Sequence, residues 1–333
     1  MTALAPLSIR LRRRLPSVAA SALLASLATG CVTVHGEQAV IPAVRKADAP
    51  AALDHFAQVV NDANTKLDPS LNAQVETGAL GAIDGAGIKA RHVNNPSGNP
   101  GYQPLRFSDT RFLIPRERGW PKWFVADTAN SRDSSRWLLV FTRDSVNDPW
   151  RASYLSVLAS GQLPDFATDA QGYAVPVPVT GTDLLVQPGE LGTRYTAYLQ
   201  QGDKGSTAFA QGGETSGLRA QRRTQYAPTP QVVTQFADQS ADPAQYAPVA
   251  LRLKDGGALV FFTTRHVMKQ TVAKGPVAVK DPNINALMTG KPNTSVTLYK
   301  VAEQVVKVPA QSDSGAKVVF LNRIEGLVSA SGA

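Results

Sequence analysis

Four short stretches rich in apolar residues follow one another closely in the first half of the chain, and they constrain the fold more than any other feature. They cover residues 110–114, 122–128, 136–143 and 150–159. Polar turn residues connect them, and these connections are too short for the helical crossover that a parallel pair of strands requires. The pattern therefore predicts an antiparallel meander.

Helices are predicted before this meander. Four apolar residues recur at steps of three and four, which is typical of an amphipathic helix: Leu53, Phe56, Val59 and Val60. Asp68 followed by Pro69 indicates a second helix start, with the aspartate as N-cap and the proline in the first turn. We expect this second helix to cover residues 71–80 and to end before the glycines that begin at Gly81.

The same order of elements is predicted again in the second half. A helix opens at residue 188, with four side chains at helical spacing: Leu191, Tyr195, Tyr198 and Leu199. A further helix is expected at 207–223. Strands are then predicted at 231–236, 249–254, 258–265, 295–301, 303–308 and 317–321, and Asp255-Gly256-Gly257 supplies a hairpin turn.

Two local similarities favour an internal duplication. The sequence LLVFT at 138–142 resembles LVFFT at 259–263, which lies 121 positions later. The sequence ETG at 76–78 resembles ETSG at 214–217. Because the order of helices and strands also repeats, we interpret the chain as two related units in tandem.

These patterns together predict an α+β fold made of two tandem helix-then-antiparallel-meander units, at 51–180 and 181–333. Helices that precede a run of antiparallel strands bury one face of the sheet. This element order resembles that of the cystatin-like and nuclear-transport-factor-2-like α+β proteins, and the resemblance rests on order alone. The sequence leaves open whether the two halves form one packed body or two domains, and it does not give the oligomeric state.

The first 31 residues have the features of an export signal. Four arginines and no acidic residue come first, and residues 15–27 are then mostly small or apolar. That run is shorter than the roughly 20 residues that a membrane span needs. The stretch Leu27-Ala28-Thr29-Gly30-Cys31 resembles the lipobox of bacterial lipoproteins, although its leucine stands four places before the cysteine instead of three. The resemblance implies a signal peptide at 1–30 and a lipid on Cys31.

A lipid on Cys31 would hold the protein at the extracytoplasmic face of the cell membrane, with residues 31–50 as a flexible tether. The alternative is an ordinary secretory signal with a cysteine nearby by chance. Arg13 and Arg14 leave both the general secretory route and the twin-arginine route open.

Charge argues against a nucleic-acid partner. The chain has 34 Lys and Arg against 26 Asp and Glu, and four of the arginines belong to the predicted signal. The mature chain would therefore carry a net charge of +4 instead of +8. Binding to nucleic acid needs basic residues clustered on one face, and a charge of +4 spread over 303 residues does not predict such a surface. Cys31 is the only cysteine, so packing alone must stabilise the mature chain.

The sequence offers few residues for catalysis or metal binding. Its four histidines, at 35, 55, 92 and 266, are not spaced as metal ligands, so we expect no metal and no cofactor, and no catalytic residue is identified. All four tryptophans lie between 120 and 150. We consider two roles for this region, either a pocket or core aromatics with ion pairs at turns. The candidate pocket residues are Trp123, Trp137, Arg143 and Trp150.

The chain from Cys31 to its end also resembles large, alanine-rich actinobacterial lipoproteins whose domain has no known function. The resemblance includes WLLVFTRD at 137–144 and WRASY at 150–154. We expect a non-enzymatic lipoprotein that binds a ligand or an envelope protein. An enzyme of the nuclear-transport-factor-2-like type is the alternative, and a buried Asp/His or Asp/Arg pair facing a closed cavity would favour it. A solute-binding lipoprotein of a transporter is a third possibility, and parallel sheets would favour that one.

Overall fold

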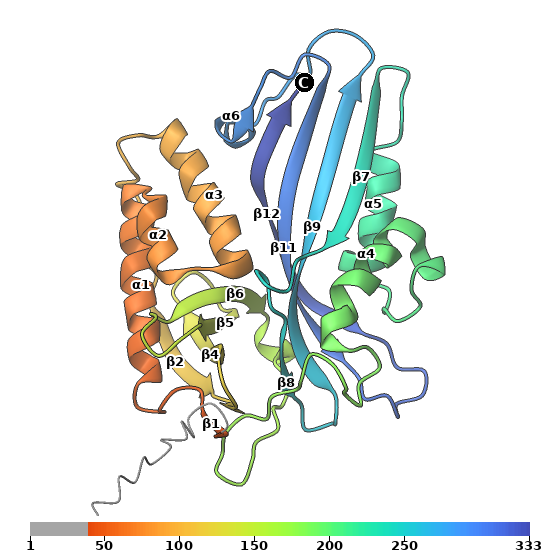
Figure 1. Ribbon diagram of the computed structural model, residues 1–333. Coiled ribbons are helices and arrows are strands. Elements are labelled where there is room, and N and C mark those ends of the chain that lie inside the picture. The colour runs from red at the N-terminus through yellow and green to blue at the C-terminus, as the bar shows by residue number, and fades with distance from the viewer. Residues whose placement is uncertain (1–38) are drawn as a thin grey trace, which may run out of the picture. The chain divides into compact units, whose positions relative to one another are not determined.

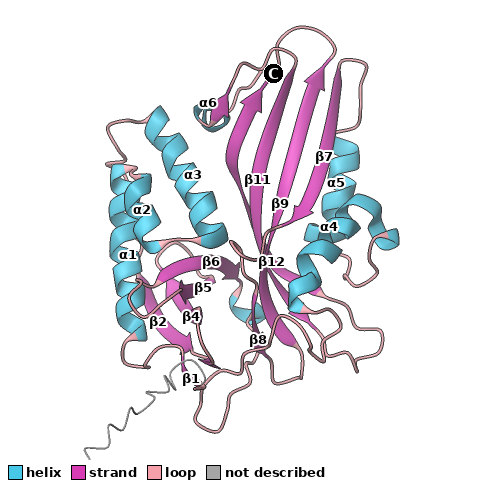
Figure 2. Ribbon diagram, in the orientation of Figure 1, coloured by secondary structure: helices cyan, strands magenta, loops and turns pink. Residues whose placement is uncertain are grey.

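Two sheets form the centre of the body, and helices cover the outer face of each (Figure 1). The computed structural model describes residues 39–333, so the predicted signal peptide and Cys31 lie outside the described residues. Helices combined with antiparallel sheets confirm the predicted α+β class, as colouring by secondary structure makes plain (Figure 2). The only parallel pairing between named strands in the described residues joins the two-residue strand β10 to β12.

The first half begins with three helices: α1 (Ala49–Lys66), α2 (Pro69–Val75) and α3 (Gly78–Asn94). Helix α1 buries Leu53, Phe56 and Val60, as its spacing predicted. The Phe56 ring meets the Phe141 ring of the sheet edge-on at 5.7 Å. At the start of α2, the Asp68 side chain accepts a hydrogen bond from the Ser70 backbone N–H, which confirms the predicted N-cap.

The glycines after residue 80 do not end a helix. Helix α2 stops at Val75, and α3 then runs through Gly81, Gly85 and Gly87 to Asn94. Each glycine within a helix costs about 1 kcal/mol of stability relative to alanine. Packing of α3 on both sheets offsets this cost. An ideal Cβ at Gly326 of β12 would lie 2.4 Å from the Ile83 side chain, so this glycine permits the close approach of α3.

The first sheet has four strands in the order β2-β4-β5-β6: β2 (Phe107–Leu113), β4 (Lys122–Asn130), β5 (Arg136–Arg143) and β6 (Arg151–Leu158). Every neighbouring pair is antiparallel, which confirms the predicted meander. A small second sheet pairs β1 (Ile41–Pro42) with β3 (Arg116–Glu117).

The folded body begins earlier than the sequence indicated. Residues 31–50 were expected to form a flexible tether, yet β1 starts at Ile41 and α1 at Ala49. Ala43, Val44 and Ala49 are buried against the first helices and sheet. These small apolar side chains lack a helical period, and they were therefore mistaken for tether residues.

The second half contains α4 (Leu191–Gln201), the π-helical turn η4 (Gly213–Gly217) and α5 (Leu218–Gln225), with single 3-10 turns at Ser160–Gln162, Pro188–Glu190 and Gly202–Lys204. Its strands are β7 (Val232–Ser240), β8 (Val249–Arg252), β9 (Ala258–Val272), β10 (Met288–Thr289), β11 (Ser295–Val308) and β12 (Val319–Gly332), and α6 covers Pro282–Ala286.

Four strands of this half are longer than their apolar runs predicted, and the first of them, β7, extends four residues past its expected end at 236. Strand β9 continues seven residues past Arg265, the predicted strands at 295–301 and 303–308 are one strand, and β12 extends to Gly332. The extra residues include many polar side chains, but their backbone groups pair across the ladders of β7, β9, β11 and β12. Backbone pairing extends these strands beyond the apolar patterns that sequence reasoning can read.

The second sheet has the order β10-β12-β11-β9-β7, and β8 also pairs with β9. The series β7-β9-β11-β12 therefore matches β2-β4-β5-β6, so sheet position makes β9 the counterpart of β4. The similar sequences at 138–142 and 259–263 lie in β5 and β9, which hold different positions in their sheets. A backbone feature does repeat: Thr77 N–H donates to the Ala152 carbonyl, and Ala210 N–H donates to the Val318 carbonyl, both at 2.9 Å.

Both halves share one central core. Val140 and Tyr154 of the first sheet pack in the same apolar cluster as Phe261 and Val305 of the second. On the other face of the second sheet, the helix α4 packs its apolar side chains over Val260 and other core residues. The polar residues described next lie on this outer face.

Candidate functional site

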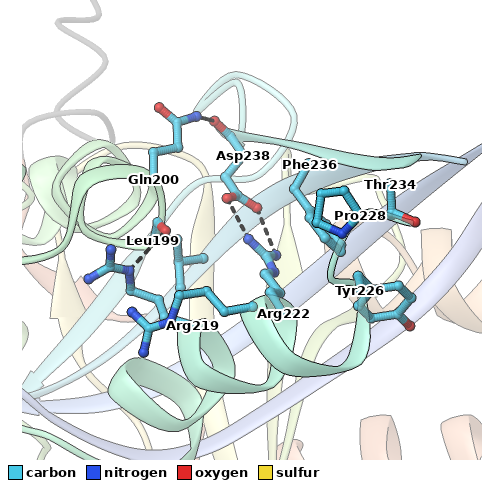
Figure 3. Close-up of a pocket in the computed structure, with 10 residues that line it drawn as sticks. Leu199, Gln200, Arg219, Arg222, Tyr226, Pro228, Thr234, Phe236 and Asp238 are labelled. Atoms are coloured by element: carbon cyan, nitrogen blue, oxygen red, sulfur yellow. Dashed lines mark hydrogen bonds and ion pairs between the residues drawn. The ribbon is translucent and has the colours of Figure 1, made fainter. Parts of the chain in front are cut away.

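A stripe of arginines on α5 faces an open groove instead of an apolar core. Arg219, Arg222, Arg223 and Tyr226 follow each other at the i, i+3, i+4, i+7 spacing that places side chains on one helix face. They line a groove of about 460 Å³ between α4, α5 and β7 (Figure 3), with Leu199, Gln200, Pro228, Thr234, Phe236 and Asp238 completing the lining. Volumes of about 300–1,000 Å³ are typical of small-molecule sites.

Arg222 is fixed at the base of this groove by a buried carboxylate. Its Nη1 and Nη2 atoms lie 2.7 and 2.9 Å from the two Asp238 oxygens, a bidentate pair (Figure 3). The Arg222 guanidinium also lies 4.6 Å from the centre of the Phe236 ring. Burial disfavours ionisation of Asp238, but hydrogen bonds from His266 and Arg222 outweigh it and hold the pKa of Asp238 below its usual value.

Asp238 in turn belongs to a buried relay on two neighbouring strands. It lies directly opposite His266 in the β7–β9 register, and His266 Nδ1 lies 2.5 Å from its Oδ1. His266 Nε2 lies 2.7 Å from Thr264 Oγ1, and Thr264 Oγ1 lies 2.6 Å from the Gln304 side-chain amide. Burial lowers the pKa of His266, so the ring is neutral at pH 7.

The order Thr264, His266, Asp238 has the geometry of a nucleophile, its base and an orienting acid. However, Thr264 has no exposed surface, and both ring nitrogens of His266 are already bonded within the protein. A substrate therefore has no access to the hydroxyl, and the ring has no free nitrogen to offer. This arrangement supports Arg222 and does not form an open catalytic centre.

A second hollow of about 270 Å³ lies on the other side of Arg222, and its charges are balanced. Glu325 accepts a hydrogen bond from Lys300 at 2.8 Å and pairs with Arg323, while Glu214 lies 3.8 Å from Arg323. Burial alone would raise the pKa of Glu325, but Arg323 and Lys300 lower it to about 2. This hollow thus has little net charge to offer a ligand.

The groove, in contrast, has two guanidinium groups that no carboxylate neutralises among the described residues. Arg219 donates from Nε to the Leu199 carbonyl at 3.2 Å and lies 5.5 Å from the centre of the Tyr198 ring. A Cβ at Gly202 would lie 2.0 Å from the Arg219 guanidinium, so this glycine lets the guanidinium lie directly against the end of α4. Arg223 is exposed, and Asp238, the one acid that lines the groove, already serves Arg222 and His266.

The structure brings together two of the four pocket residues predicted from the sequence. The Arg143 guanidinium lies 5.1 Å from the ring centre of Trp150 and equally far from that of Trp120. Trp123 points to the opposite face of the first sheet, into the central core. Trp137 lies at the far end of β5 from Arg143, with its ring 5.8 Å from that of Phe107.

Sequence reasoning missed the α5 groove. The helix spacing of Arg219, Arg222 and Arg223 was visible, but the helix expected at 207–223 was assigned no functional role. Asp238 and His266 are 28 positions apart in sequence, and only the register of β7 and β9 places them side by side. The alternation of Thr264 and His266 along β9 was the single further signal.

Fold and site together define an α+β protein with an arginine-lined groove on the outer face of its second sheet. The chain matches the family described as Domain of unknown function (DUF8094) over residues 40–332, and it belongs to that family. It is 47% identical over 314 residues to an uncharacterized lipoprotein of Streptomyces avermitilis, covering 94% of this chain and 93% of the relative. These matches confirm the predicted family of actinobacterial lipoproteins.

Two further relatives are similar to this chain over most of its length. An uncharacterized lipoprotein of Streptomyces coelicolor is 46% identical over 95% of this chain and 94% of its own length. A second one from the same organism is 26% identical over 90% of each chain. No solved structure matches this chain, so the cystatin-like and nuclear-transport-factor-2-like resemblance stays a prediction. None of the helices within residues 39–333 combines the length and apolarity needed to cross a membrane.

Proposed function

We propose that this protein is a lipid-anchored, extracytoplasmic binding protein whose α5 groove takes a small anionic ligand carrying a carboxylate or a phosphate. The unneutralised pair Arg219 and Arg223, beside the fixed Arg222, is the observation that carries the proposal. Guanidinium groups bind carboxylate and phosphate in a planar, two-pronged geometry. Phe236 and Tyr226 add aromatic surface beside the arginines.

The anchor in this proposal is a lipid on Cys31. The lipobox-like stretch before Cys31 supports it, and so does the description of the Streptomyces relatives as lipoproteins. Labelling cells with an acyl-chain probe tests the anchor by itself. The wild-type protein is expected to carry the label and Cys31→Ala to lose it, and a labelled Cys31→Ala protein would contradict the anchor.

A non-enzymatic role is favoured over the enzyme alternative. The buried Asp238 pairs with both His266 and Arg222, as that alternative required, but the groove beside them is open to solvent and not a closed cavity. The Thr264 hydroxyl is inaccessible, and the His266 nitrogens are occupied. Antiparallel sheets likewise disfavour the alternative of a transporter's solute-binding lipoprotein.

Thermal unfolding of the mature protein tests the binding proposal. Sodium citrate and inorganic phosphate serve as the anionic probes, with sodium chloride at equal ionic strength and glucose as controls. An anion at about 100 times its Kd would add about 2.7 kcal/mol and raise the Tm by about 4 °C. Whichever probe gives the larger shift distinguishes carboxylate from phosphate chemistry.

Matched variants locate the effect. Arg223→Gln and Arg219→Gln are expected to reduce the citrate or phosphate shift at least about threefold, whereas Arg106→Gln, an exposed arginine before β2, should leave it unchanged. An anion shift that is equal in all three variants, or no shift beyond that of sodium chloride, would overturn the proposal.

A further inference from the structure

One end of the body, where the described chain begins, exposes apolar and aromatic side chains. Three segments meet there and are called the tether-proximal end: residues 40–45, the turn at 118–121 and the loop at 144–150. Strand β3 leads directly into the turn at 118–121, so its pairing with β1 joins the first two segments. A hollow of about 550 Å³, lined by Pro42, Val44, Arg143 and Trp150 among others, joins the third.

Four of the nine large apolar side chains that are exposed in the described residues belong to this end: Val40, Ile41, Trp120 and Val146. Trp120 is 42% exposed and Val146 is 66% exposed. Scattered single exposed residues need no explanation, but a group on one small surface marks a contact. This concentration therefore indicates a partner for the tether-proximal end.

The Trp120 ring is exposed and also held in place. Arg143 lies between the Trp120 and Trp150 rings, 5.1 Å from each ring centre. The apolar side chains are accompanied by the exposed Arg118 and by Arg45, which pairs with Asp48, and the exposed Lys46 follows directly. Tryptophan together with Arg and Lys is the combination that proteins place at the boundary between lipid and water.

The length of chain before this end identifies the partner. Eight residues lie between Cys31 and Val40, and the nine Cα-to-Cα steps across them span at most about 30 Å when fully extended. A lipid on Cys31 would thus keep the tether-proximal end within a short distance of the bilayer at all times.

We propose that the tether-proximal end docks onto the surface of the membrane that holds the lipid, with Trp120 at the level of the headgroups and Val40, Ile41 and Val146 beside it. This inference rests on the proposed anchoring at Cys31. Because tethering raises the effective concentration of the surface, a weak interfacial contact is enough. Helix α5 covers the face of the second sheet that is turned away from β1, so the arginine groove stays open to solvent in this orientation (Figure 1).

The single cysteine allows a test that is independent of cellular lipidation. Mature protein beginning at Cys31 is coupled through that thiol to a maleimide lipid in vesicles of phosphatidylglycerol and phosphatidylcholine. Brominated phosphatidylcholine in these vesicles quenches tryptophan fluorescence at short range. Trp120→Phe is expected to remove more than about half of the quenching seen in the wild-type protein, because Trp123 is buried in the core.

A matched variant places a tryptophan at the other end of the body. Val233, at the start of β7, is exposed and pairs with Thr271, which in turn pairs with Ser295 beside the C-terminal end of β12. Val233→Trp in the Trp120→Phe background is expected to add fluorescence without adding quenching. Equal quenching of both positions, or quenching that Trp120→Phe leaves unchanged, would overturn the docking proposal. Since the coupling is chemical, these results do not depend on whether cells acylate Cys31.

Discussion

The second sheet has a buried polar cluster on each face, and the two differ in how their charges are balanced. On the outer face, Asp238 and Glu325 each contact at least one cation. On the inner face, Glu303 meets two further carboxyl groups, Glu76 and Asp84, which come from the α2–α3 link and from α3. One cluster mixes both signs, and the other is dominated by acids.

This difference sets the protonation of each cluster in opposite directions. Cations hold the pKa of Glu325 at about 2, against the effect of burial. Burial raises the pKa of Asp84 to about 6, and burial with repulsion from Asp84 raises that of Glu76 well above its usual value. Burial likewise raises the pKa of Glu303. The outer carboxylates are therefore held in their charged form, whereas burial favours the protonated form of Glu76 and Glu303 on the inner face.

The comparison shows why only one face is suited to binding an anion. Glu303 serves the junction of the halves by accepting a hydrogen bond from the Leu155 N–H of β6 at 3.1 Å, and Glu76 accepts one from Asn72 within the first half at 2.7 Å. The outer cluster fixes Arg222, and its neighbours Arg219 and Arg223 leave positive charge facing solvent.

The largest effect is expected from Asp238→Asn. Removal of one partner from a buried pair leaves the other charge uncompensated, which costs about 3–5 kcal/mol; here Arg222 loses its compensating charge and His266 loses its anionic hydrogen-bond acceptor. Urea unfolding at pH 7 measures the change, with Asp203→Asn on the exposed η3 turn as the control. A loss of unfolding free energy below about 1 kcal/mol would show that the negative charge of Asp238 does not stabilise the outer cluster.

Glu325→Gln is expected to cost somewhat less, about 2–3 kcal/mol at pH 7, and its cost should depend on pH. Because the folded pKa is lowered, the stabilisation by ionised Glu325 is complete above its usual pKa near 4.5 and is lost as the pH falls toward 2. Denaturant midpoints of the two proteins between pH 7 and pH 3 should therefore converge on the acid side. Convergence on the alkaline side would contradict the lowered pKa of Glu325 in the folded protein.

Glu303→Gln should have the opposite sign. The folded pKa of Glu303 is raised, so its contribution is favourable at low pH and becomes a penalty as the pH rises. The variant keeps an acceptor for Leu155 N–H and carries no charge, so it should be about 1–2 kcal/mol more stable than wild type at pH 8 and no more stable at pH 4. Destabilisation at pH 8 would mean that the inner carboxylate is charged and paired.

Arg223→Gln is expected to change stability least, by under about 0.5 kcal/mol, because the side chain is exposed. Its effect should appear in anion binding alone. A large loss of stability in urea would show that Arg223 holds the fold together, and the surplus charge would then not be free for a ligand.

Much of the fold followed from hydrophobic periods. The α1 stripe, the Asp68 cap, the first-sheet strands and the start of α4 near Leu191 were all predicted, because each combines local propensity with an apolar period. The parts of β9 after residue 265 and of β12 after residue 321 were missed, because backbone pairing, and not apolar side chains, extends these strands.

The site was less predictable than the fold. Arg143 and Trp150 do meet, but Trp123 points the other way because successive residues of a strand face opposite sides. The Asp238–His266 pair depends on the register between two strands, and nothing local to either residue fixes that register. Only the arginine spacing of α5 could be read from sequence. Whether these arginines leave positive charge for a ligand depends on which carboxylates line the groove, and the sequence does not show that Asp238 is the one acid there.

A calorimetric titration of citrate into the mature protein tests the central claim most directly. The wild-type protein is expected to bind one citrate, with an affinity that falls as sodium chloride is added. The double variant Arg219→Gln, Arg223→Gln should bind at least about tenfold more weakly, while Arg106→Gln binds as the wild type does. Equal affinity in all three proteins, or no heat of binding in the wild type, would contradict an anion site in the α5 groove.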